Sequence, residues 1–138
     1  MKQRILIVED DLINREVLAF WVRKIGNFEI QEATNGREAL EIITSDPPDC
    51  ILMDLRMPWL DGWQATRQIR AQEVGRHIPI IAVTACAMVG DEERALAAGC
   101  DAYIAKPIMH HNQLAERIAP FLLTGLSGDL GRRLRLYH

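Results

Sequence analysis

The chain has 138 residues, of which 49% are hydrophobic and 25% are charged, so it is long enough for one packed domain and too short for two. Its net charge is −3, and three arginines follow Asp129 without any acid beside them, so the rest of the chain is more acidic still; this argues against a general nucleic-acid-binding surface. We therefore expect no direct DNA binding. No apolar run approaches the roughly 18 residues of a membrane-spanning helix, so we expect a cytoplasmic protein without membrane insertion.

Five short apolar runs alternate with segments of helical period along the chain. They cover residues 5–8, 29–33, 50–53, 79–83 and 102–105. Such alternation is typical of a parallel sheet with helices on both faces, whose central strands are apolar throughout. The run at 29–33 has the weakest apolar content and is expected at an edge. The pattern therefore predicts one α/β domain.

The first helix is predicted between the first two strands, over residues 11–26. Apolar residues recur there at spacings of three and four, which is the period of one helix face, and Gly26 ends the segment. We expect the buried face to consist of Ile13, Val17, Phe20, Trp21 and Ile25.

Four further helices are predicted after the other strands. The fourth has a weak apolar stripe over residues 91–98 and ends at Gly99, a position suited to a left-handed cap. The expected buried residues are Ala39, Leu40 and Ile43 in the second helix, Ala65, Ile69 and Val74 in the third, and Leu114, Ile118, Phe121 and Leu122 in the fifth. We expect the domain to span residues 1–123 and residues 124–138 to form a short, flexible basic tail; a docking segment for an acidic surface is the alternative.

Reactive side chains follow four of the predicted strands. In an open parallel sheet, ligands bind beyond the carboxyl ends of the strands, where these side chains would meet. Carboxylates from two neighbouring strands would repel each other unless a cation lay between them, and Mg²⁺ is the simplest such cation. The side chains are Glu9, Asp10 and Asp11 after the first strand, Asp54 after the third, Thr84 after the fourth and Lys106 after the fifth.

The same set has the parts needed for phosphoryl chemistry. Asp54 would be the nucleophile, while a metal ion and Lys106 would neutralise the oxygens of the transferred group and Thr84 would donate a hydroxyl to one of them. Taken singly, each residue also fits an ordinary role, and Asp11 fits a helix cap better than a ligand. Their joint placement at successive strand ends favours the functional interpretation.

Four motifs in this order resemble the receiver domain of two-component response regulators. They are Glu9-Asp10, Asp54 within residues 51–58 followed by Asp61-Gly62, Thr84-Ala85, and Lys106-Pro107. The similarity covers residues 4 to about 123, and the second half looks especially like DivK-type single-domain regulators and the receivers of hybrid histidine kinases. The resemblance implies a doubly wound (βα)5 fold of the flavodoxin and CheY-like kind, with strand order 2-1-3-4-5.

The resemblance also implies roles for the acidic residues. Asp54 would accept a phosphoryl group from a sensor histidine kinase or a histidine phosphotransfer protein. Asp10 would bind Mg²⁺ directly and Glu9 through water, and Asp54 and the backbone carbonyl of Arg56 would complete the protein ligands.

Three further residues receive roles in the same way. Thr84 and Lys106 would contact the phosphoryl oxygens, Tyr103 would change rotamer with Thr84, and the Lys106-Pro107 peptide bond would be cis.

Arg56 and Cys86 lie two residues beyond Asp54 and Thr84, at positions where side chains modulate hydrolysis of the aspartyl phosphate. An arginine at position 56 would pair with the phosphoryl group or shield it from attacking water. Equally, Arg56 could be a solvated loop charge without such a role.

Candidate partner contacts lie on two sides of the predicted site. Leu12, Ile13, Asn14 and Pro58 are expected to meet the kinase or phosphotransfer protein. Met88 and Val89 are expected on the face of the fourth helix, fifth strand and fifth helix, which would signal to a downstream protein. We expect a monomer or a weak, phosphorylation-dependent dimer.

The function that follows is that of a single-domain response regulator, which catalyses only its own phosphorylation and a slow autodephosphorylation. One alternative is a small Mg²⁺-dependent phosphatase, which is disfavoured because Arg56 stands where a second acid is expected and no glycine-rich phosphate loop is present. Another is a phosphorylation-independent scaffold, in which loss of the acceptor, the acids or the lysine would be expected.

Overall fold

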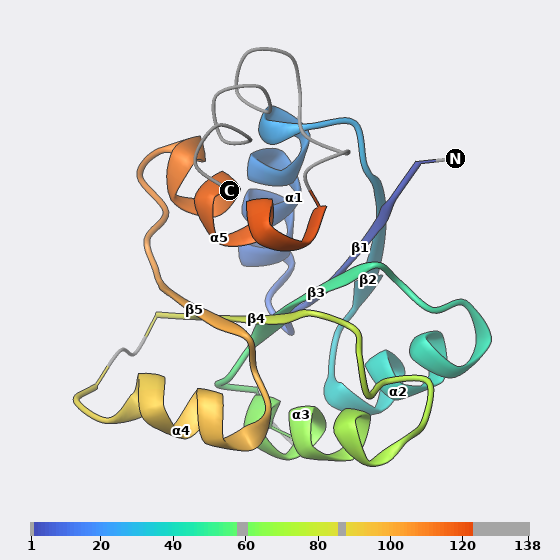
Figure 1. Cartoon of the computed structure of the whole chain (residues 1–138). Helices are drawn as coiled ribbons and strands as arrows, with labels where there is room; N and C mark the ends of the chain where they lie inside the picture. Colours follow the sequence, from blue (N-terminus) through green and yellow to red (C-terminus); the bar gives the residue numbers. More distant parts are fainter. Residues whose placement is uncertain (1, 58–60, 86–87, 123–138) are drawn as a thin grey trace.

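Five parallel strands form one sheet in the order β2-β1-β3-β4-β5, with helices between them (Figure 1). The computed structural model describes residues 2–57, 61–85 and 88–122. The strands are β1 (Arg4–Val8), β2 (Glu29–Ala33), β3 (Cys50–Asp54), β4 (Ile80–Thr84) and β5 (Ala102–Ala105). The helices are α1 (Leu12–Ile25), α2 (Gly36–Ser45), α3 (Gly62–Ala71), α4 (Asp91–Ala98) and α5 (His111–Leu122). The predicted α/β class and strand order are confirmed, and β2 lies at an edge as expected.

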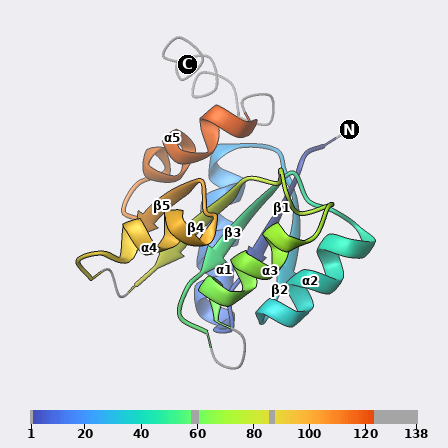
Figure 2. The same cartoon turned by 60° about the horizontal axis from the view of Figure 1, so that its bottom comes forward.

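Two hydrophobic cores lie on opposite faces of the sheet. Alternate residues of β1 point to each side, so Ile5 and Ile7 pack with α1 and α5, whereas Leu6 and Val8 pack with α2 and α3. Figure 1 shows α1 and α5 on one side of the sheet and α2, α3 and α4 on the other, and the turned view brings this second group forward (Figure 2). Because both faces are covered, β1, β3 and β4 are apolar along almost their whole length.

The register of the sheet brings the carboxyl ends of the central strands to one rim. Val8 pairs with Met53, Asp54 with Val83, and Thr84 with Ala105. Residues at the carboxyl ends of β1, β3, β4 and β5 therefore lie side by side, although they are distant in sequence.

The longest helix among the described residues, α1, has 14 residues, and no helix there meets the length and apolar character of a membrane span.

The predicted buried face of α1 is largely wrong. Ile13 is 70% exposed, and Val17 and Phe20 are about half exposed, whereas Ile25 is buried as expected. The buried residues are Leu18, Ala19, Val22 and Ile25. Apolar residues occur around most of this helix, so periodicity alone allowed two stripes, and the packing of α1 on β1 and α5 selected the one that begins at Leu18.

Two smaller predictions about the helices are also wrong, and one is confirmed. Helix α3 ends at Ala71, so Val74 lies beyond it and is exposed, and Phe121 on α5 is exposed at the edge of the core. Helix α4 has the expected bounds, and Gly99 ends it with φ of 117°, which an L side chain rarely adopts. The predicted tail at 124–138 lies outside the described residues.

The buried face of α1 predicts which side-chain truncations on this helix lower the free energy of unfolding. Leu18→Ala should lower the free energy of unfolding by about 2 to 4 kcal/mol, because it opens a cavity in the core. Val17→Ala, one residue earlier on the exposed side, should cost less than about 1 kcal/mol. Urea unfolding followed by circular dichroism measures both, and equal losses would contradict the assigned face.

Candidate functional site

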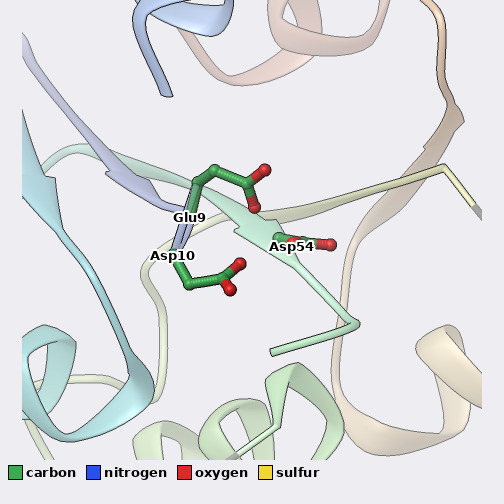
Figure 3. A group of neighbouring side chains, drawn as sticks. All are labelled: Glu9, Asp10 and Asp54. Atoms are coloured by element: carbon green, nitrogen blue, oxygen red, sulfur yellow. The ribbon is translucent and has the colours of Figure 1, made fainter. Parts of the chain in front are cut away.

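Three carboxylates meet at the rim of the sheet. Glu9 and Asp10 follow β1, and Asp54 is the last residue of β3. One carboxylate oxygen from each lies within 4.8 Å of the others, and Figure 3 shows the three side chains converging. Glu9 and Asp54 are buried and Asp10 is exposed. The structure thus brings together the acids that the sequence placed on two strands.

The backbone around the acids fixes where they point. The Glu9 N–H donates to the carbonyl oxygen of Ala33 at 3.0 Å, which extends the β1–β2 pairing by one residue. Asp11 accepts from the N–H of Asn14 at 2.9 Å, so it caps α1. Arg15, which the sequence analysis did not single out, donates from its side chain to the Glu9 carbonyl at 3.0 Å.

The Asp54 carboxylate is held by the loop that follows it. Its Oδ1 accepts from the backbone N–H of Arg56 at 3.1 Å. Gly62, at the start of α3, packs so closely on this strand end that a Cβ there would overlap the carbonyl oxygen of Asp54. The motif glycine is therefore needed for close approach of α3, a reason that the sequence alone did not supply.

Lys106 balances only part of the negative charge. Its Nζ lies 3.2 Å from Oε1 of Glu9, and both side chains are largely buried. Burial and the negative charge of Asp54 raise the pKa of Glu9 to about 7, against the lowering effect of Lys106. The other oxygen, Oε2, is buried without a hydrogen-bond partner among the described residues. An unsatisfied carboxylate oxygen beside two further acids fits a cation site.

Thr84 is the last residue of β4, the strand that pairs with β3, and Tyr103 lies on β5. Thr84 is fully buried, and neither its Oγ1 nor the Tyr103 hydroxyl has a hydrogen-bond partner in the described part of the chain. The Lys106 N–H donates to the Thr84 carbonyl at 2.8 Å, so the two strand ends are joined through the backbone. The Lys106-Pro107 peptide bond is cis.

Arg56 reaches away from the carboxylate cluster. Its guanidinium Nη2 lies 3.3 Å from Oδ2 of Asp91, the first residue of α4. The hydrogen bond from the Met88 N–H and the positive charges of Arg56 and Arg94 lower the pKa of Asp91. Sequence reasoning missed Asp91, because an acid in the first turn of a helix is common for its interaction with the helix dipole alone. Cys86 lies outside the described residues.

The predicted partner contacts fall on two separate surfaces. Leu12, Ile13 and Asn14 are exposed at the start of α1. Beside them is a groove of about 340 Å³ lined by Asn14, Val17, Leu18, Ala85, Lys106, Pro107 and Ile108. Met88 and Val89 are exposed just before α4. Pro58 lies outside the described residues.

The chain is similar to proteins of one family. It matches the family model of the response regulator receiver domain over residues 5–119. It is 43% identical over 108 residues to the polar-differentiation response regulator DivK of Brucella anthropi, covering 78% of this chain and 87% of DivK.

Two solved receiver domains have the same architecture. One, from a sensor histidine kinase of Pseudomonas aeruginosa, has a magnesium ion coordinated in its active-site cleft; it is 40% identical, with a TM-score of 0.79 and coverage of 88% of this chain and 98% of that one. The other, from a Saccharomyces cerevisiae response regulator, was crystallised with a histidine phosphotransfer signalling protein; it is 30% identical, with a TM-score of 0.77 and coverage of 95% and 97%.

The chain therefore belongs to the response regulator receiver family, as its motifs predicted. Members of this family are regulators rather than enzymes that act on external substrates, which disfavours the phosphatase alternative.

The close carboxylates predict an unusual effect on stability. Asp54→Asn should raise the free energy of unfolding by about 1 to 2 kcal/mol in EDTA at pH 8, above the raised pKa of Glu9, because it removes one of three mutually repelling charges and keeps an acceptor for the Arg56 N–H. It should also reduce the stabilisation that added MgCl2 gives to the wild type. Chemical unfolding with and without MgCl2 measures both effects.

Glu41→Gln supplies the control, because it removes an exposed carboxylate on α2 without touching the cluster. It should leave both quantities unchanged. If Asp54→Asn is no more stable than the wild type in EDTA, the repulsion is not significant.

Proposed function

We propose that this receiver domain accepts a phosphoryl group on Asp54 from a histidine kinase or histidine phosphotransfer protein and passes the signal to a protein partner. One observation carries the proposal: a buried Asp54 carboxylate lies at the strand rim with Glu9 and Asp10, and the Lys106 ammonium contacts the same cluster. A buried nucleophile beside both acidic and cationic groups suits transfer of a charged phosphoryl group.

The residues present fit Mg²⁺. Glu9, Asp10, Asp54 and the backbone carbonyl of Arg56 would hold it, with Glu9 acting through water. The buried, unpartnered Oε2 of Glu9 and the magnesium ion in the Pseudomonas receiver support this assignment. Bound Mg²⁺ would draw negative charge from the phosphoryl oxygens and so reduce repulsion between donor and acceptor.

The protein's own residues would orient the transfer. An oxygen of Asp54 attacks the phosphorus of the phosphohistidine, the P–N bond breaks, and its electron pair stays on the imidazole nitrogen. The Arg56 N–H, 3.1 Å from Oδ1, keeps the carboxylate from rotating. Lys106 would turn from Glu9 to the phosphoryl oxygens.

The unpartnered hydroxyl of Thr84 supplies the switch. It would donate to the phosphoryl group, a bond that is available only after transfer, and the adjoining β4–α4 loop would move inward. Tyr103 would follow, since it faces a hollow of about 620 Å³ lined by Glu92, Tyr103, Ile104, Ala105, Gln113, Glu116 and Arg117. This hollow lies on the α4, β5 and α5 face, and we propose that it meets the downstream protein together with Met88 and Val89, which are exposed just before α4.

The phosphodonor would dock on α1. The exposed side chains of Leu12, Ile13 and Val17 continue the apolar groove that leads to Lys106. The co-crystal structure of the yeast receiver with a phosphotransfer protein supports a partner of that class. Exposed apolar residues beside a reactive centre suit a transient helical partner.

Catalysis, location and oligomeric state complete the proposed function. The domain would catalyse only its own phosphorylation and a slow autodephosphorylation, in the cytoplasm. It would act as a monomer or a weak, phosphorylation-dependent dimer. A scaffold independent of phosphorylation is disfavoured because the acceptor, the acids and the lysine are all retained.

The acceptor assignment predicts a covalent product. Incubation with acetyl phosphate and MgCl2 should add the mass of one phosphoryl group to the wild type and none to Asp54→Asn. EDTA should prevent the addition. Intact-protein mass spectrometry measures the product, and an equal addition to the two proteins would place the acceptor elsewhere.

The docking surface predicts a loss that is specific to protein donors. Val17→Asp should slow transfer from a phosphotransfer protein that phosphorylates the wild type by roughly 10-fold, because an unpaired carboxylate would be buried in the contact. Its reaction with acetyl phosphate should not change. Val74→Asp is the matched control, since Val74 is similarly exposed beyond α3. Equal slowing by both substitutions would exclude α1 as the docking surface.

A further inference from the structure

Arg56 contacts two different parts of the domain. Its backbone N–H donates to Oδ1 of Asp54 at 3.1 Å, while its guanidinium group lies 3.3 Å from Oδ2 of Asp91. The first contact holds the acceptor carboxylate and the second reaches the first turn of α4. One residue therefore connects the acceptor to the beginning of the helix that borders the proposed output face.

Asp91 organises the segment that precedes α4. Its Oδ2 also accepts from the Met88 N–H at 2.9 Å, and the Asp91 N–H in turn donates to the Met88 carbonyl oxygen at 3.0 Å. Asp91 is 5% exposed, unlike its neighbours Glu92 and Glu93, which are exposed. A buried carboxylate of this kind depends on its partners, and Arg56 compensates part of its charge.

A second arginine extends the contact to α3. Nη1 of Arg94 lies 3.9 Å from Oδ1 of Asp91. The guanidinium group of Arg94 also lies over the ring of Trp63, 4.4 Å from the ring centroid. Arg94 would hold Asp91 even when Arg56 leaves it. Arg56 can therefore leave Asp91 for another anionic group while Asp91 keeps a positively charged neighbour.

We propose that Asp91 is a positioning residue that holds the Arg56 side chain away from the acceptor, and that an aspartyl phosphate on Asp54 competes with Asp91 for that side chain. The proposal rests on the phosphoryl acceptance proposed above, and it adds a regulatory role for a residue outside the acceptor site. Arginine pairs with phosphate through two parallel N–H bonds, and the phosphoryl group brings about two negative charges to a site next to the Arg56 backbone.

The exchange has two consequences. Arg56 on the phosphoryl group hinders hydrolysis, in which a water oxygen attacks phosphorus, the P–O bond to Asp54 breaks, and the carboxylate and inorganic phosphate are released. Asp91 without Arg56 loses its contact with the loop that follows β3, so the start of α4 is no longer tied to the acceptor. Tyr103 is within the same electrostatic environment, because burial and the charges of Asp91 and Glu92 raise the pKa of its phenol while Arg56 lowers it. The pair would therefore link phosphoryl lifetime to the output face.

A double-mutant cycle on phosphoryl lifetime tests the proposal. The wild type, Asp91→Asn, Arg56→Ala and the double variant are phosphorylated with acetyl phosphate, freed of donor, and followed by intact mass. Asp91→Asn should lengthen the half-life by about 3- to 10-fold, because Arg56 is released to the phosphoryl group. Arg56→Ala should shorten the half-life or leave it unchanged, and the double variant should match Arg56→Ala.

The controls separate this proposal from a structural effect and from the acceptor assignment. Glu93→Gln removes an exposed charge from the same turn and should leave the half-life unchanged. If Asp91→Asn alters the half-life equally in both Arg56 backgrounds, or not at all, Asp91 does not act through Arg56. Wild-type protein that gains no phosphoryl group would instead overturn the proposed function and this inference with it.

Discussion

Glu9, Asp10 and Asp54 are held close together at one rim of the sheet, although their charges oppose this arrangement. Three carboxylates within 4.8 Å repel one another, and Lys106 offsets only part of that charge. The protein retains this arrangement because rigid, apolar strands hold the acids in place: β1 and β3 are buried on both faces and are paired along their length. The stability of the two cores thus maintains a site that is electrostatically unfavourable without a cation.

The cationic groups near this site are directed to different partners. Lys106 contacts Glu9 within the cluster, whereas the Arg56 guanidinium contacts Asp91 at the start of α4. The Thr84 and Tyr103 hydroxyls are buried without partners among the described residues. Added charge on Asp54 would therefore act on groups that have bonds to gain or to exchange. A local charge change of this kind can bias a nearby segment because differential contacts separate the two states.

The two candidate partner surfaces differ in chemistry as well as in position. The groove beside α1 has a mainly apolar lining and leads to Lys106, so a partner there would lie beside the acceptor. The hollow at α4, β5 and α5 is lined by Glu92, Glu116, Arg117 and Tyr103 and is more polar. Lys106 lines the first surface and directly follows β5, which contributes to the second. The first surface therefore borders the strand rim directly, and the second reaches it along β5.

The order of elements, the doubly covered central strands, and the acids, threonine and lysine at the strand ends could all be predicted from the amino-acid sequence. Strand periodicity and chain order dictate which residues reach the carboxyl rim. The sequence did not determine which side of α1 is buried: Ile13, Val17 and Phe20 have the helical spacing that was expected inside, yet they are exposed. Nor did it reveal why residue 62 must be glycine or that Arg56 pairs with Asp91, 35 residues away. Those features depend on how helices pack against the sheet, and such contacts between distant segments exist only once the tertiary structure has formed.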